Sequence, residues 1–206
     1  VAADRTKRFG QGWDGNPVWS PDREKIAFAS KRDGHYEIYV MNADGTDYKR
    51  LTDGENFNKN QPAWSPDGTK IVFQGQSREE PYQSEIYVMD AADGKNVQRL
   101  TDDAKFTHKQ ATSNEGNPAY SPDGTKIAFW TTRNGPVVEQ WVMNPDGTEQ
   151  KPLLMIIDVG PLRGKAATWR PNGKEIILSV YQHNNWDVWK MDADGKNPKR
   201  LTTDGA

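Results

Sequence analysis

The hydrophobic positions of the chain gather in short clusters that recur four times in the same order. Each round opens with an aromatic residue and a proline turn, continues with two apolar runs, and closes with an Asp-Gly turn and a short segment such as YKRLT. The first apolar runs are KIAFAS, KIVFQG, KIAFWT and EIILSV, and the second are EIYVM, EIYVM, EQWVM and DVWKM. Runs this short and this rich in Ile, Val and aromatic residues predict β-strands rather than helices.

Polar turns separate these runs. Pro-Asp or Pro-Asn follows each leading aromatic residue, and Asp-Gly follows each second apolar run. Proline presets the backbone for the first turn position, and glycine accepts a positive φ without steric cost. Asp-Gly between two apolar runs is also a strong hairpin signal. Each round therefore predicts four antiparallel strands joined by turns.

The leading aromatic residues recur at intervals of about 45 to 56 residues, a period typical of propeller blades. They are Trp19, Trp64, Tyr120 and Trp169. We therefore expect an all-β fold, a β-propeller of four blades with four antiparallel strands each, forming a single domain over 1–206. The blades are expected at about 16–54, 61–103, 117–155 and 166–206, with 1–15 as an extra N-terminal strand and link.

One four-stranded sheet with two apolar faces cannot bury both alone, so neighbouring blades must cover each other. Large rings recur at equivalent places in the third predicted strands, at Tyr39, Tyr87, Trp141 and Trp189. Together with the leading aromatic residues, these rings are predicted to fill the layers between blades.

The stretches NPVWSPD, IYVMNADGTDYKRLT and QPAWSPDGTKIVF resemble the Pro-Asp, WD-like repeat of TolB-type β-propellers. The resemblance covers about 16–206 and is specific for fold. It implies a bacterial periplasmic or extracellular interaction protein, because TolB-like propellers are periplasmic interaction proteins. The same repeat also forms the gating propeller of prolyl-oligopeptidase-like peptidases, so the resemblance does not transfer a site.

Three architectures are compatible with four blades. The chain forms a closed four-blade ring, or it is part of a larger propeller, or two copies assemble; TolB-type propellers usually have six blades. An open arrangement would leave the outer faces of the first and last blades exposed.

The links between the second and third strands, and between blades, differ from repeat to repeat and are predicted to share one face of the propeller. Loops on a rigid scaffold commonly carry recognition residues, and aromatic residues interleaved with Arg, Asn and His suit a binding surface. Arg133 also falls in these links. The candidate partner-binding residues are Trp13, His35, Tyr36, Phe57, Tyr82, Phe106, His108, Arg163, His183 and Trp186.

No catalytic, cofactor or metal site is predicted. The sequence contains no Gly-x-Ser-x-Gly elbow and no phosphate-binding glycine loop, and its histidines lack zinc-ligand spacing. An acid begins each third strand, and we expect it to pair with a neighbouring Lys or Arg. These acids are Glu37, Glu85, Glu139 and Asp187.

Composition narrows the classes of molecule that the protein is expected to bind. The formal net charge of -2 gives no strong field toward nucleic acid or an anionic membrane, and no apolar run is long enough to span a bilayer. The sequence thus predicts a non-catalytic scaffold that binds a protein or peptide through the loop-rich face. The alternatives are a carbohydrate-recognition or polysaccharide-processing module, and a propeller segment of a larger secreted or peptidase-associated protein.

Overall fold

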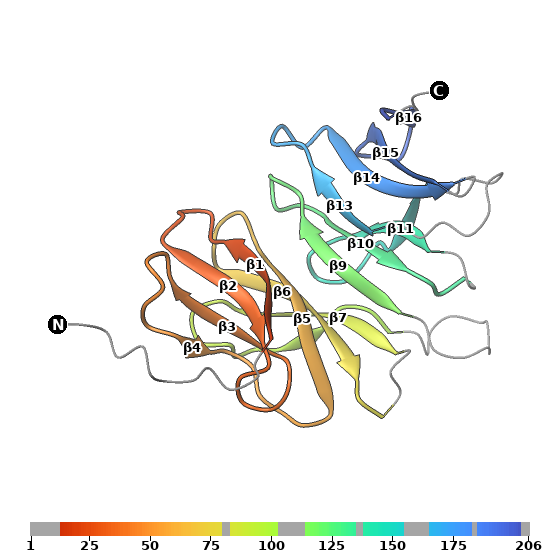
Figure 1. Cartoon of the computed structure of the whole chain (residues 1–206). Coiled ribbons are helices and arrows are strands. Elements are labelled where there is room, and N and C mark those ends of the chain that lie inside the picture. The colour runs from red at the N-terminus through yellow and green to blue at the C-terminus, as the bar shows by residue number, and fades with distance from the viewer. Residues whose placement is uncertain are drawn as a thin grey trace.

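The computed structural model describes residues 13–79, 83–102, 114–134, 138–154, 165–182 and 185–202. Strands and turns account for this part of the chain, which contains no helix. The strands form four antiparallel sheets of four, each built from consecutive strands (Figure 1). We call these sheets blades 1 to 4. The all-β fold of four four-stranded blades is therefore confirmed.

Blades 1 and 2 contain the first eight strands. Their bounds are β1 Asp14–Trp19, β2 Lys25–Ser30, β3 Glu37–Asn42, β4 Lys49–Arg50, β5 Phe57–Trp64, β6 Lys70–Ser77, β7 Ser84–Asp90 and β8 Gln98–Arg99. The expected extra strand in 1–15 lies mainly in residues outside the described ranges, and Asp14 and Gly15 belong to β1.

Blades 3 and 4 repeat this order. Their strands are β9 Glu115–Tyr120, β10 Ile127–Thr131, β11 Glu139–Met143, β12 Lys151–Leu154, β13 Lys165–Trp169, β14 Glu175–Gln182, β15 Asn185–Asp192 and β16 Lys199–Arg200.

A bulge interrupts the first strand of each blade, where the register with the second strand shifts. In blades 1 to 3 a polar residue directly precedes a proline at this place and has a positive φ of 50°, 53° and 45° at Asn16, Gln61 and Asn117. Proline has no N–H to give to the ladder, so the strand bends there instead of pairing.

The apolar faces of neighbouring blades pack into three layers. Blades 1 and 2 share a cluster that includes Ile38, Leu51 and Met89, and blades 2 and 3 share one around Phe129. Blades 3 and 4 share a third cluster around Ile176. The expected layers between blades are thus confirmed.

Tryptophan side chains also tie the layers together. The Trp64 indole N–H donates to the Val18 carbonyl at 3.3 Å, and the Trp169 indole N–H donates to the Ala119 carbonyl at 3.1 Å. Each bond joins a blade to the one before it.

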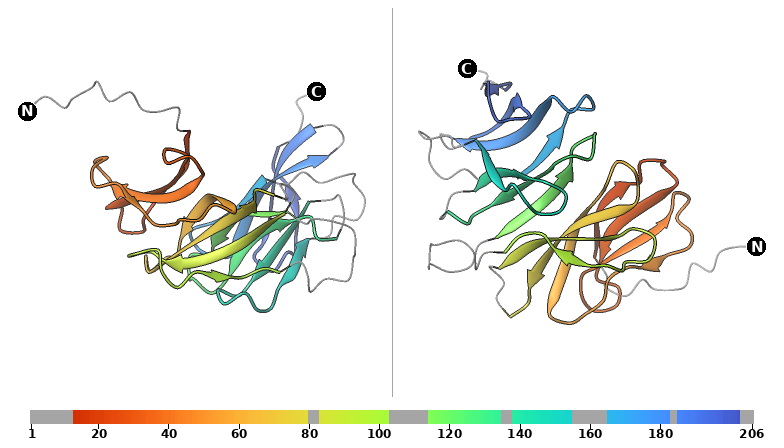
Figure 2. Two further views of the ribbon diagram at one scale, coloured as in Figure 1. Left: turned by 90° about the horizontal axis from the view of Figure 1, so that it is seen from below. Right: turned by 180° about the vertical axis from the view of Figure 1, so that it is seen from behind.

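The blades form an open arc. In the described strands, packing joins blade 1 to 2, 2 to 3 and 3 to 4, and blades 1 and 4 stand at opposite ends of the row (Figures 1 and 2). The expectation that Trp19 fills a layer between blades is wrong for this reason, since no described blade covers that face and Trp19 is 54% exposed. A closed four-blade ring is not what the structure shows.

Turns and links lie at opposite ends of the blades. The tight turns between first and second strands stand toward the upper left of Figure 1, and the links that follow β2 and β6 lie toward the bottom of that view. The turns stack from blade to blade, so that Gly68 lies beside Pro21, and Gly124 beside Pro66. We call the opposite end, which contains the described links 31–36, 51–56, 78–79, 100–102 and 132–134, the loop-rich end.

Candidate partner-binding end

The start of β1 and the β2–β3 link bring three aromatic or cationic side chains together at the loop-rich end. The rings of Trp13 and Tyr36 meet edge to face with centroids 5.4 Å apart, and Lys31 Nζ lies 5.9 Å from the Tyr36 ring centre. The Lys31 N–H donates to the Trp13 carbonyl, which holds the chain start against the link. Trp13 is 51% exposed and Tyr36 is half-buried, so the Trp13 ring is the more accessible of the two.

His35 lies beside the links of blade 2. An Arg78 guanidinium nitrogen is 3.1 Å from His35 Nε2, and the same nitrogen donates to the Glu55 carbonyl at 2.7 Å. The backbone of blade 1 also joins blade 2 here, because the Lys59 N–H donates to the Tyr36 carbonyl. Trp13, His35 and Tyr36 therefore share one region across the junction of blades 1 and 2.

Phe57 belongs to blade 2 and Trp186 to blade 4. Phe57 begins β5, is 39% exposed, and has its ring centre 6.3 Å from that of Tyr87. Trp186 is in β15 of blade 4 and is 42% exposed. The remaining candidates, Tyr82, Phe106, His108, Arg163 and His183, lie outside the described residues. A binding role for all ten stays a prediction.

The four acids expected at the starts of the third strands lie within the first three residues of β3, β7, β11 and β15, and the closing segments hold three of them. Glu37 pairs with Arg50 Nη2 at 3.3 Å and with Lys59 Nζ at 3.2 Å, and Thr52 donates its hydroxyl to the same carboxylate. The expected pairing with Lys or Arg is therefore confirmed for Glu37. The same arrangement holds Glu85 with Arg99 and Thr101, and Asp187 with Arg200 and Thr202.

Blade 3 departs from this pattern. Its closing strand has Pro152 where the others have arginine. Glu139 accepts hydrogen bonds from the Trp141 indole at 2.8 Å and from the Asn134 amide at 2.7 Å instead. The expected Lys or Arg partner is therefore wrong for Glu139, because this blade supplies neutral donors.

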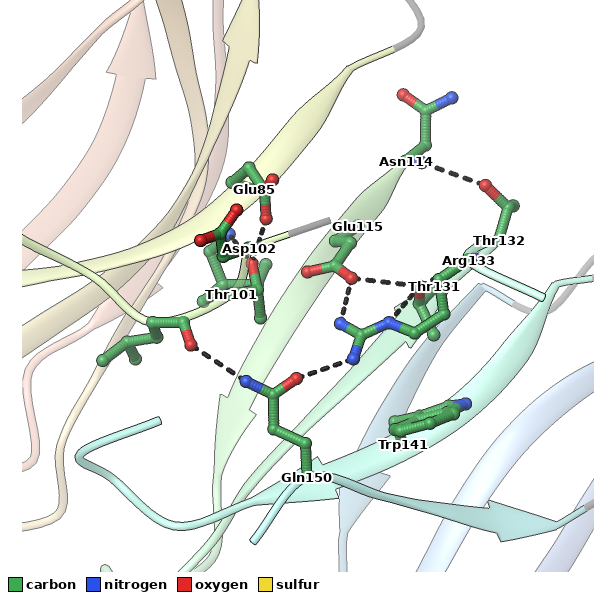
Figure 3. Close-up of polar contacts among 12 residues, drawn as sticks. Glu85, Thr101, Asp102, Asn114, Glu115, Thr131, Thr132, Arg133, Trp141 and Gln150 are labelled. Atoms are coloured by element: carbon green, nitrogen blue, oxygen red, sulfur yellow. Dashed lines mark hydrogen bonds and ion pairs between the residues drawn. The ribbon is translucent and has the colours of Figure 1, made fainter. Parts of the chain in front are cut away.

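Arg133 is a link residue that the structure places in the interior. Its guanidinium lies between Glu115, the Thr131 hydroxyl and the Gln150 amide oxygen, at the junction of blades 2 and 3 (Figure 3). Its Cζ is also 4.7 Å from the centre of the Trp141 ring. Arg133 is buried, so its expected place on an exposed recognition surface is wrong.

A cavity of about 280 Å³ lies at the junction of blades 1 and 2. It is bounded by the segment that closes blade 1 and by β5, β6 and β7 of blade 2. The aromatic rings of Phe57, Phe73 and Tyr87 line it, together with the acids Asp53 and Glu55. Burial raises the pKa of the Tyr87 hydroxyl, so that ring stays neutral.

The described residues contain no group of three or more His, Asp or Glu side chains arranged to hold a metal ion. They also contain no helix that could cross a membrane.

Comparison with known proteins identifies the repeat. The model of the TolB β-propeller domain family matches residues 5–117, more than half of the chain. The uncharacterized protein Atu1656 of Agrobacterium fabrum is 33% identical over 184 residues, which cover 85% of this chain and 57% of that protein. The Tol-Pal system protein TolB of Ruthia magnifica is 31% identical over 90 residues, covering 43% of this chain and 20% of that protein.

Solved structures agree on the fold. TolB from Acinetobacter baumannii matches with a TM-score of 0.72 at 25% identity, covering 92% of this chain and 43% of that one. Lyase and peptidase structures also match, but at 13% to 16% identity they show the fold alone. The chain spans less than two thirds of the length of these relatives. Its repeat, its four-stranded blades and the match over 5–117 show that the chain belongs to the TolB β-propeller domain family.

Proposed function

We propose that the chain is a non-catalytic, TolB-like binding propeller that recognises a protein or peptide partner through its loop-rich end. The edge-to-face pair of Trp13 and Tyr36, in which the Trp13 ring is exposed, carries this proposal. Tyrosine and tryptophan bury large areas at a small cost in side-chain entropy, and they are enriched among residues that dominate binding energy. Lys31, His35 and Arg78 beside the pair favour a partner with acidic groups.

The relatives suggest where to look for the partner. The matched TolB proteins belong to the Tol-Pal system by name, so the Tol-Pal components of the source bacterium are the first candidates. We accordingly propose that the protein acts in the periplasm or outside the cell.

Binding of purified Tol-Pal components by calorimetry tests the proposal. We expect the double substitution Trp13→Ala with Tyr36→Ala to weaken binding at least tenfold, since truncating a residue that dominates an interface costs about 2 kcal/mol or more. Lys95→Ala, an exposed change at the opposite end, should leave the affinity unchanged. If the double variant binds as tightly as the wild type, the loop-rich end is not the recognition surface, and if no component binds, the partner is not of the Tol-Pal kind.

A carbohydrate ligand is the second candidate, because Trp13 and Trp186 present exposed indole rings on which a sugar could stack. Retention of a polysaccharide that is lost on Trp13→Ala or Trp186→Ala would favour it over the protein partner.

A further inference from the structure

The cavity between blades 1 and 2 lies where blade 2 departs from an arrangement that blades 1 and 3 share. In each of blades 1 to 3 an aromatic pair lies directly across the second and third strands. The pairs are Phe28 with Tyr39, Phe73 with Tyr87, and Phe129 with Trp141.

Blades 1 and 3 cover their aromatic pair with an arginine. Arg32 Cζ lies 5.2 Å from the ring centre of Phe28 and 4.9 Å from that of Tyr39. Arg133 Cζ lies 5.4 Å from the ring centre of Phe129 and 4.7 Å from that of Trp141. A guanidinium over an aromatic face is attracted by the ring quadrupole, and its planar shape allows stacking.

Two further positions anchor each arginine. A hydroxyl lies two residues before it and accepts its Nε–H, at 2.9 Å for Ser30 and 3.1 Å for Thr131. The first-strand residue opposite that hydroxyl is an acid that pairs with the guanidinium. These acids are Asp14 in blade 1 and Glu115 in blade 3.

Blade 2 changes all three positions and keeps the rings. Lys59 occupies the position of the acid. It lies opposite Gly75, which occupies the position of the hydroxyl-bearing residue, and Ser77 occupies the position of the arginine. Phe73 and Tyr87 remain stacked with centroids 5.7 Å apart. Among the described residues no Lys or Arg lies over either ring, and the cavity of about 280 Å³ opens at this place.

The charges around the cavity suit a cation. Lys59 also lines the cavity, and its ammonium group contacts Glu37 and the carbonyls of Asp53 and Gly54, so its charge is already matched. Asp53 and Glu55 line the cavity too, and in the described residues neither carboxylate forms a salt bridge. The volume lies just below the range of about 300 to 1,000 Å³ for drug-sized ligands, which fits one side chain better than a cofactor or an oligosaccharide.

We propose that this cavity is a binding site for an arginine side chain presented by a protein partner, taking the place that Arg32 and Arg133 fill in the neighbouring blades. The incoming guanidinium stacks on Phe73 and Tyr87, with Phe57 at the rim and Asp53 and Glu55 supplying the opposite charge. This site deepens the proposed function and rests on it for the nature of the partner.

A peptide titration tests the site by itself. The probes are the blocked tripeptide Gly-Arg-Gly and its citrulline counterpart, which has the same shape without the charge, followed through the NMR signals of the Gly75 amide and the Tyr87 ring. We expect saturable binding of the arginine peptide and about tenfold weaker binding of the citrulline peptide, as expected for a partly desolvated cation–π contact with nearby acids.

Two arginine substitutions give the matched comparison. Ser77→Arg places an arginine at the equivalent position of blades 1 and 3 and should abolish peptide binding. Gln76→Arg adds the same charge one residue away, on the opposite face of the strand, and should leave binding intact. Phe57→Ala, at an exposed ring, should weaken binding about threefold and serves if Ser77→Arg does not fold.

The assignment is overturned if both peptides bind equally, if neither saturates, or if binding survives both Ser77→Arg and Phe57→Ala. These outcomes leave the affinity for Tol-Pal components through Trp13 and Tyr36 untouched, so failure of the site and failure of the proposed function are distinguishable.

Discussion

The serine and aspartate of the Ser-Pro-Asp-Gly turns form a small hydrogen-bond network that explains why this motif recurs. The Ser65 hydroxyl donates to Asp67 Oδ1 at 2.6 Å and accepts the Lys70 N–H at 2.9 Å. Asp67 in turn accepts the Thr69 N–H at 3.0 Å. The turn that joins the first and second strands is thus closed by side chains as well as by backbone.

Ser65→Ala removes this closure. Ser65 is buried, and its loss leaves the Lys70 N–H without the acceptor it has in the native turn. We expect the free energy of unfolding to fall by about 1 to 3 kcal/mol, measured by urea denaturation. Ser121→Ala, at the equivalent place in blade 3, should cost a similar amount. A loss below a few tenths of a kcal/mol at both sites would show that the backbone alone forms these turns.

The same network makes stability depend on pH. The hydrogen bonds from the Ser65 hydroxyl and the Thr69 N–H hold the pKa of Asp67 below its usual value. As pH falls below about 4, the unfolded chain takes up a proton at this residue before the folded chain does. The contribution of Asp67 is therefore present above that pH and is lost as pH falls through the folded pKa.

Asp67→Asn should weaken this dependence. We expect the urea midpoint of the variant to decline less than that of the wild type between about pH 5 and pH 2.5. Parallel declines in the two proteins would mean that Asp67 contributes nothing to acid sensitivity.

In blades 2 and 3 the Asp-Gly turn lies against the residue that directly follows the closing strand of the blade before it. A Cβ at Gly94 or Gly147 would overlap the carbonyl oxygen of Leu51 or Leu100. Gly45, the equivalent residue in blade 1, has nothing within 4 Å of that position. All three glycines have a positive φ, so only the contact between blades distinguishes them.

Alanine substitutions at these turns distinguish the cost of backbone strain at a positive φ from the cost of disturbing the contact between blades. Gly45→Ala should cost about 1 kcal/mol for the positive φ alone. Gly94→Ala should cost at least twice as much, because the turn must also move away from Leu51. Equal losses in the free energy of unfolding would contradict the observed packing of blade 2 on blade 1.

The strands and turns of the fold could largely be predicted from the sequence, whereas several contacts between strands could not. The repeat predicts four strands per blade correctly, because short apolar runs and glycine turns determine strands and hairpins through local interactions. The bulges at Asn16, Gln61 and Asn117 do not follow from the pattern of apolar runs, since they result from a proline in an otherwise regular strand. The position of Arg133 in a link predicts an exposed side chain. The linear sequence does not show that Arg133 pairs with Glu115 of the neighbouring first strand. Aligning Arg32 with Arg133, and Asp14 with Glu115, reveals an arginine that lies over the aromatic pair in blades 1 and 3 and is absent from blade 2.

The arc as a whole leaves one apolar face of blade 4 uncovered by any described residue. Leu100 is 6% exposed beneath blade 3, whereas Leu201, its equivalent in blade 4, is 45% exposed. Ile177 is also partly exposed, while its equivalents Val72 and Ala128 are fully buried. The sequence cannot distinguish a closed ring from an open arc, because the repeated residues are the same in both. The two differ only in whether another blade covers the outer face of blade 4.

Two leucine substitutions test the arc in solution. Leu100→Ala should lower the free energy of unfolding by about 2 to 5 kcal/mol, as expected for a buried leucine. Leu201→Ala should cost less than about 1 kcal/mol. A cost for Leu201→Ala as large as that for Leu100→Ala would show that the outer face of blade 4 is covered in solution.

Backbone hydrogen exchange with and without the bound Tol-Pal component tests most directly whether the dissimilar links recognise the partner. The proposed function predicts protection in the links at 31–36, 51–57 and 78–79, with the tight turns at 43–46 and 65–69 unchanged. Protection centred on those turns, with the links exchanging as in the free protein, would contradict it.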